Sequence, residues 1–87
     1  MVLVEKMSEG KYKVKVEESG SATEHIVTLD DSYYQKLTGG RITPEQLIEK
    51  SFQFLLNRES KESILSQFKL KTIGFYFPEY ENEIQQM

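Results

Sequence analysis

The chain has 87 residues, a formal net charge of −3 and no cysteine. This length predicts one domain with a small hydrophobic core, and the absence of cysteine excludes disulfides, thiol nucleophiles and cysteine-based zinc sites. Lysine, arginine and acidic residues are mixed along the whole chain, whereas nucleic-acid-binding proteins usually gather their basic residues on one face, so the composition argues against such a partner.

The sequence also contains no signal that directs the protein to a membrane. No apolar run approaches the ~20 residues that a transmembrane helix requires. The first ten residues, MVLVEKMSEG, lack the basic start and the apolar stretch of a secretory signal. We therefore expect a cytoplasmic protein that does not bind membranes.

Residues 1–29 have the pattern of β-strands. In KYKVKVEE, the apolar residues Tyr12, Val14 and Val16 alternate with lysines, which is the period of a half-buried strand. The turn cluster ESGSA around Gly20 follows, and then TEHIVTL, which is rich in β-branched residues. Together with MVLVEKM before them, these segments predict a three-stranded antiparallel meander.

A row of three lysines lies on the other side of the middle strand. Lys11, Lys13 and Lys15 alternate with the apolar residues, and Glu17 and Glu18 close the row. An alternating lysine row is typical of the solvated face of a sheet. The alternative is a stripe that follows a phosphate backbone, and the two glutamates argue against it.

Residues 30–78 have helical spacing instead. In LDDSYYQKLTGG, Asp30 or Asp31 can accept the free amides of a first helical turn. Gly39 and Gly40 can end the helix, because glycine tolerates left-handed backbone geometry. A helix of only about two turns must pack against other elements to be stable.

The segment 44–57 has the clearest helix pattern in the chain. Thr43, Pro44 and Gln46 form a capping box with a proline start, and Ile42 and Leu47 form a hydrophobic staple. Apolar residues then recur at three- and four-residue steps: Leu47, Ile48, Phe52, Leu55 and Leu56. Phe54 lies beside this stripe and widens it. We expect this segment to be the central core helix.

The remaining residues predict short elements. A short helix is expected from Ser60, with Ile64, Leu65 and Phe68 on its apolar side. An aromatic segment, IGFYFP, ends at a proline, and residues 79–87 form an acidic tail. The sequence as a whole predicts a single α+β domain over 1–87, with a three-stranded antiparallel meander followed by three to four helices.

Enzymatic residue sets are scarce. The single histidine, His25, lies on a predicted strand, where a packing or surface role is more common than catalysis. The spacing of Glu79, Glu81 and Glu83 matches no metal-binding motif. A weaker third hypothesis is a small-ligand or catalytic site at the glycine-containing start of the core helix, residues 39–43, which lacks the lysine of a phosphate loop. We therefore predict no catalytic, cofactor-binding or metal-binding residue, no cofactor, and a protein that is not an enzyme.

Aromatic residues gather near the C-terminus. These are Phe75, Tyr76, Phe77 and Tyr80. Aromatic side chains are enriched in protein interfaces, so these four residues are the candidate surface for a protein partner. The alternative is that they belong to the core, as aromatic residues of small domains often do.

Residues 25–59, HIVTLDDSYYQKLTGGRITPEQLIEKSFQFLLNRE, resemble a ribbon-helix-helix unit. That family implies a dimer in which paired strands enter the DNA major groove and the second helices build a shared core. The candidate ribbon here departs from the pattern, because it offers no arginine or lysine: one side carries Glu24, Ile26 and Thr28, and the other carries His25 and Val27. A preceding strand would also compete to pair with it.

The phrases YKVKVEE, LTGGRITPEQLIEKSFQFLLNRES, ESILSQF and IGFYFPEYENEI, in this order, resemble a group of small uncharacterised bacterial proteins. The resemblance covers nearly the whole chain and implies a soluble bacterial α+β domain. It implies no activity and no site residues. Two functional hypotheses follow: a small non-enzymatic protein-interaction module, or a ribbon-helix-helix-like dimeric DNA-binding regulator. The oligomeric state is left open.

Overall fold

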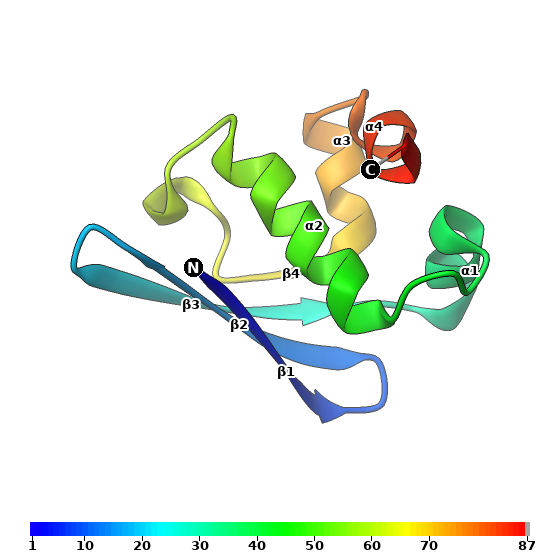
Figure 1. Ribbon diagram of the computed structural model, residues 1–87, viewed down its shortest axis with the longest axis horizontal. Helices are drawn as coiled ribbons and strands as arrows, with labels where there is room; N and C mark the ends of the chain where they lie inside the picture. Colours follow the sequence, from blue (N-terminus) through cyan, green and yellow to red (C-terminus); the bar gives the residue numbers. More distant parts are fainter. Residues whose placement is uncertain (87) are drawn as a thin grey trace.

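A computed structural model describes residues 1–86 and has a sheet on one side and helices on the other (Figure 1). The sheet has the order β1-β2-β3-β4, with strands β1 (Val2–Ser8), β2 (Lys11–Glu18), β3 (Ser21–Thr28) and β4 (Gln67–Lys69). The helices are α1 (Asp31–Thr38), α2 (Pro44–Leu56), α3 (Ile73–Tyr76) and α4 (Tyr80–Gln86), with 3-10 turns η1 (Lys61–Ser63) and η2 (Leu70–Thr72). This is the α+β fold that the sequence predicts.

The antiparallel meander of the first three strands is confirmed. β1 pairs with β2 so that Val4 lies opposite Val14, and β2 pairs with β3 so that Val14 lies opposite His25. The side chains of Tyr12, Val14, Val16 and Val27 are buried under the helices. Alternation along the strands therefore assigns one face of the sheet to the core and leaves the lysine side on the other face.

The core helix is also confirmed, together with its start. In α2 the Thr43 hydroxyl accepts a hydrogen bond from the Gln46 amide at 3.1 Å, and the Gln46 side chain accepts one from the Thr43 amide at 2.9 Å. Both Phe52 and Phe54 are buried. Phe52 contacts His25 of the sheet, whereas Phe54 contacts aromatic rings of the C-terminal helices. The helix is therefore covered on two sides.

α1 follows the prediction at its end and in the position of its N-cap, but the expected capping hydrogen bond is absent. Gly39 closes the helix in the left-handed conformation, with φ of 62°. Asp30 occupies the N-cap position, yet its side chain makes no capping hydrogen bond. α1 is instead held through Tyr33 and Lys36, which contact Glu81 of α4 at 2.8 and 3.3 Å.

The short helix predicted from Ser60 is wrong beyond its first turn. After η1 the chain becomes extended at Ile64 and forms β4, which pairs in parallel with β3. The Ile26 amide donates a hydrogen bond to the Ser66 carbonyl at 2.8 Å. The edge of β3 offers these backbone bonds, and a local helical pattern of apolar residues cannot outweigh them.

The predicted acidic tail is also a helix within the residues that the structure describes. α4 buries Tyr80 and Ile84 against the domain. Its Glu81 contacts Tyr33 and Lys36 of α1, and its Glu83 pairs with Arg58, which follows α2, so these acidic residues hold α4 in place. Met87, the last residue of the predicted tail, lies outside the described residues.

β3 is an internal strand, which bears on the ribbon-helix-helix resemblance. It pairs with β2 on one edge and with β4 on the other. A ribbon-helix-helix dimer needs this strand to pair with a second chain, so the structure lacks the free ribbon that the resemblance implies. Across residues 1–86, no helix combines the length and apolar character needed to cross a membrane.

The central position of α2 gives a stability prediction. Phe52→Ala should lower the free energy of unfolding by about 3–5 kcal/mol, because it removes a fully buried ring and leaves a cavity. Gln53→Ala, a change at the exposed neighbouring residue, should alter the free energy of unfolding by no more than about 0.5 kcal/mol. Urea unfolding of the three proteins tests this, and a loss below 1 kcal/mol for Phe52→Ala would contradict the core role of α2.

Candidate functional site

The structure divides the four aromatic residues of the predicted partner surface. Phe75 and Tyr76 on α3 are 79% and 67% exposed. Phe77 is half-buried, and its ring lies edge-on to Phe54 with 5.8 Å between ring centroids. Tyr80 is fully buried. Of these four residues, the two on α3 are the ones largely exposed to solvent, and Phe77 lies at their border.

The assignment of Tyr80 to a partner surface is wrong, because this residue belongs to the core. Its hydroxyl lies 2.6 Å from the Ser51 hydroxyl, which itself donates to the Leu47 carbonyl at 2.8 Å. Tyr80 must therefore be the donor to Ser51. Burial raises the pKa of Tyr80 above its ordinary value, since the phenolate would lose its hydration. The tyrosine joins α4 to α2.

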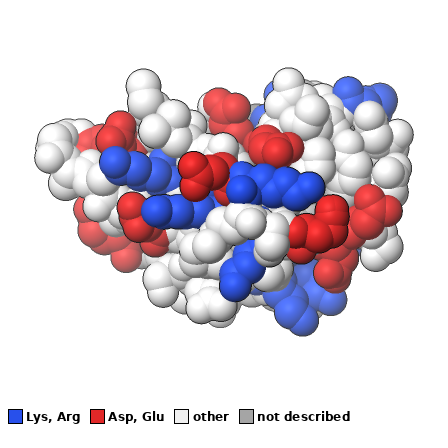
Figure 2. Space-filling model, turned by 90° about the horizontal axis from the view of Figure 1, so that it is seen from below, with Lys and Arg blue, Asp and Glu red and all other residues white. Residues whose placement is uncertain are grey.

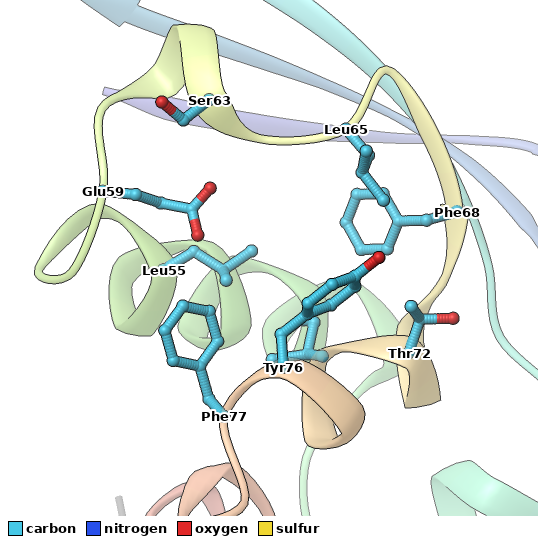
Figure 3. A pocket seen from close by; sticks show the side chains of 9 residues that line it. Leu55, Glu59, Ser63, Leu65, Phe68, Thr72, Tyr76 and Phe77 are labelled. Carbon is cyan, nitrogen blue, oxygen red and sulfur yellow. The ribbon is translucent and has the colours of Figure 1, made fainter.

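An apolar groove lies beside Tyr76, at the junction of α2, the segment after η1, and α3 (Figure 3). Its volume is about 350 Å³. We call it the aromatic groove; its apolar walls are Leu55, Leu65, Phe68, Ile73, Tyr76 and Phe77. Three polar residues complete the lining: Glu59, Ser63 and Thr72. The groove thus continues the exposed aromatic surface of α3 into the domain.

His25 holds one wall of the aromatic groove in place. Its Nδ1 lies 2.7 Å from the Leu65 carbonyl, which can only accept, so Nδ1 carries the proton. Nε2 lies 2.8 Å from the Thr23 hydroxyl, within hydrogen-bond distance. The imidazole is buried and packs against Phe52, with 5.4 Å between ring centroids. Both ring nitrogens are therefore engaged, and the histidine has a positioning role.

Arg58 connects the end of α2 to the C-terminal segment that contains α4. Its guanidinium lies 3.6 Å from the ring centre of Phe54 and donates to the Phe54 carbonyl at 3.1 Å. It also binds the carboxylates of Glu79 at 3.2 Å and Glu83 at 3.0 Å. The pKa of Glu79 is lowered, first by a hydrogen bond from its own backbone amide and then by Arg58. These acidic residues therefore stabilise α4.

The glycine-containing turn before α2 uses its polar groups internally. The Thr38 hydroxyl donates to the Tyr34 carbonyl at 2.9 Å and accepts from the Gly40 amide at 3.0 Å. The Arg41 side chain donates to the Thr38 carbonyl at 2.9 Å. These bonds account for the turn as a structural connection between α1 and α2.

The outer face of the sheet carries mixed charge. Figure 2, which views the molecule from the side of the sheet, shows basic and acidic side chains interspersed across this face. Lys13 lies 3.6 Å from Glu24, and Lys15 lies 3.2 Å from Glu17. These pairs neutralise two of the lysines locally, which favours the solvated-face interpretation over a phosphate-binding stripe.

Comparison of the chain with protein-family models, with curated proteins and with solved structures gives no match. The candidate site therefore rests on the geometry of the chain itself.

Sequence reasoning found α3 but missed the groove next to it. The sequence predicts Leu65 and Phe68 on one side of a helix, whereas in the structure Phe68 belongs to β4, Leu65 precedes this strand, and both line the groove. The aromatic run at residues 75–77 was the useful signal. Glu59 gave no signal, because a glutamate after a helix end is ordinary in sequence.

The environment of Tyr80 predicts a loss of stability at alkaline pH. The folded state keeps the phenol protonated, whereas the unfolded chain ionises it near its ordinary pKa of about 10. The contribution of Tyr80 to the free energy of unfolding is therefore fully present below pH ~10. Above this pH it falls by about 1.4 kcal/mol per pH unit. Tyr80→Phe should therefore reduce the loss of unfolding free energy per pH unit above pH ~10 by up to about 1.4 kcal/mol. At pH 7 the same change should lower the free energy of unfolding by about 1 kcal/mol, because the hydrogen bond to Ser51 is lost.

Urea unfolding from pH 8 to pH 11 measures this effect. Tyr12 and Tyr33, whose pKa values burial also raises, keep part of the slope in the variant. Tyr76→Phe, a change at an exposed tyrosine, should show the same dependence of unfolding free energy on pH as the wild type. Equal slopes for Tyr80→Phe and the wild type would contradict the buried position of the hydroxyl.

Proposed function

We propose that the chain is a small, non-enzymatic, cytoplasmic interaction module that binds a protein partner through α3 and the aromatic groove. The observation that supports this is the exposure of Phe75 and Tyr76, at 79% and 67%, directly beside the groove. Leu65, which lines the groove, is itself 49% exposed. Single exposed apolar residues are common on proteins, but neighbouring ones that continue into a groove mark a binding surface.

A partner would gain binding free energy at this surface from two sources. Covering Phe75 and Tyr76 removes apolar area from water, worth about 25 cal/mol per Å² before the costs of association. Aromatic side chains also lose little conformational entropy on binding and are enriched among the residues that dominate interfaces. The concave groove can also accommodate a side chain of the partner.

The lining of the groove supports binding rather than catalysis. Ser63 is hydrogen bonded to Ser60 at 3.2 Å. Within the described residues no hydrogen bond joins it to Glu59, the one titratable carboxylate of the lining, whereas a serine nucleophile needs a base within hydrogen-bond reach. The DNA-binding alternative gains no support from a specific feature. Residues 26–28 of β3 are paired on both edges, and Lys13 and Lys15 of the sheet face pair with glutamates.

A display library of random 12-residue peptides tests the proposal. Peptides selected on the wild-type protein should bind a Phe75→Ser, Tyr76→Ser double variant at least tenfold more weakly, because the double variant loses the aromatic contacts. Both side chains are exposed, so the change should cost no more than about 0.5 kcal/mol per site in stability. Fluorescence polarisation gives the affinities, and urea unfolding checks the fold.

Leu3→Ser is the matched control. Leu3 is an apolar residue that is 48% exposed on β1, outside the groove lining. Peptides should bind this variant as tightly as they bind the wild type. Failure to enrich any peptide, or equal binding to the double variant, would overturn the proposed function.

A further inference from the structure

Glu59 is the only charged residue in the lining of the aromatic groove, as far as the described residues show. It follows the end of α2 and is half-buried. In Figure 3 its carboxylate points into the groove, over Leu55 and toward the space between Phe77 and Ser63. A carboxylate in this position faces whatever fills the groove.

The ion pairs within residues 1–86 do not include Glu59. The nearby acidic residues differ in this respect, since Arg58 holds Glu79 and Glu83 and Lys61 holds Glu62. The carboxylate of Glu59 is thus available to a basic group from outside the domain. A half-buried carboxylate among apolar walls gains more from such a pair than a fully solvated one does.

We infer that the occupant of the aromatic groove is a peptide segment of a partner protein that places an apolar or aromatic side chain in the groove and a neighbouring lysine or arginine on Glu59. This inference rests on the proposed function and specifies the chemistry of the partner. The apolar walls take the first side chain, and charge complementarity selects the second. An arginine can bind both carboxylate oxygens at once, which favours it over lysine.

The size and the surroundings of the groove fit a peptide better than a free small molecule. A volume of about 350 Å³ is near the lower end of ligand pockets, which run from roughly 300 to 1,000 Å³, and suits one or two large side chains. Phe75, outside the groove lining and 79% exposed, extends the apolar surface past the groove. A peptide can cover both, whereas a ligand confined to the groove leaves Phe75 in water.

The overall charge of the protein supports the same occupant. The chain has a net charge of −3, so it attracts basic segments and repels acidic ones at long range. Among the lining residues of the groove, none carries a positive charge to receive an acidic side chain. A partner segment that is acidic at this position would meet Glu59 with a like charge.

The peptides selected on the wild-type protein also test this inference. They should be enriched in Lys or Arg at a fixed spacing from an apolar residue. One selected peptide is then synthesised in three forms, with Lys, Gln or Glu at the basic position, and titrated against the wild type, Glu59→Gln, Glu59→Lys and Glu49→Gln. Glu49 is an exposed glutamate on α2 outside the groove lining and serves as the control.

We expect Glu59→Gln to weaken the affinity for the Lys peptide about threefold to tenfold, as for a partly shielded ion pair. The affinity for the Gln peptide should not change. Glu59→Lys should reverse the preference, so that the Glu peptide binds best. Raising NaCl from 50 to 500 mM should weaken binding of the Lys peptide to the wild type, because salt screens the ion pair with Glu59. Binding of the Gln peptide should not change. Glu49→Gln should match the wild type throughout.

The outcomes separate the two proposals. If peptides bind through Phe75 and Tyr76 but show no basic preference, or if Glu59→Gln behaves like Glu49→Gln, the inference is overturned and the proposed function stands. If no peptide is enriched, both fail. If free phenethylamine displaces the labelled peptide as strongly as unlabelled peptide does, the groove is a small-molecule site and the peptide occupant is overturned.

Discussion

Phe52 and Phe54 leave α2 in different directions, and the rest of the domain is arranged to cover both rings. Phe52 packs against His25 of β3 and Phe68 of β4. Phe54 packs against Phe77 and Tyr80 at the C-terminal end of the chain. A thirteen-residue helix with two apolar sides must pack against other parts of the chain on both sides. The sheet covers one side, and the short C-terminal elements cover the other.

The aromatic groove lies where these two covers meet. Leu55 forms its floor, the segment leading into β4 forms one wall, and α3 forms the other. β4 has three residues and α3 has four, so neither element is stable alone. Their positions depend on contacts with α2 and β3. The core beneath thus fixes the positions of these elements, while Phe75 and Tyr76 on α3 stay exposed to solvent.

Polar contacts fix the positions of these short elements. His25 is hydrogen bonded to the Leu65 carbonyl, Tyr80 is hydrogen bonded to Ser51, and Arg58 pairs with the carboxylates of Glu79, before α4, and Glu83, within it. Among the described residues, no buried side-chain nitrogen or oxygen lacks a hydrogen-bond partner. Satisfied polar contacts of this kind select one arrangement of the short elements, since any shift would leave a buried group unpaired. Glu59 stands apart because its carboxylate faces the groove.

Local sequence patterns by themselves determined the three-stranded meander and the core helix. Alternation in residues 11–18 assigned the faces of β2, and the capping box at Thr43 assigned the start of α2, because both signals act over only a few residues. The sequence also placed exposed aromatic residues on α3. It could not separate Tyr80 from them, because burial depends on what packs against a side chain.

Tertiary structure alone decided β4, α4 and the groove. The residues of β4 lie about 40 positions after their partners in β3, and only the fold brings that strand edge within reach of them. α4 forms from an acidic segment because Arg58, Tyr33 and Lys36 meet its glutamates and because Ser51 receives Tyr80. The groove that Glu59 lines is built from α2, the segment before β4, β4 and α3, which only the tertiary fold brings together, so no local pattern in the sequence could have revealed it.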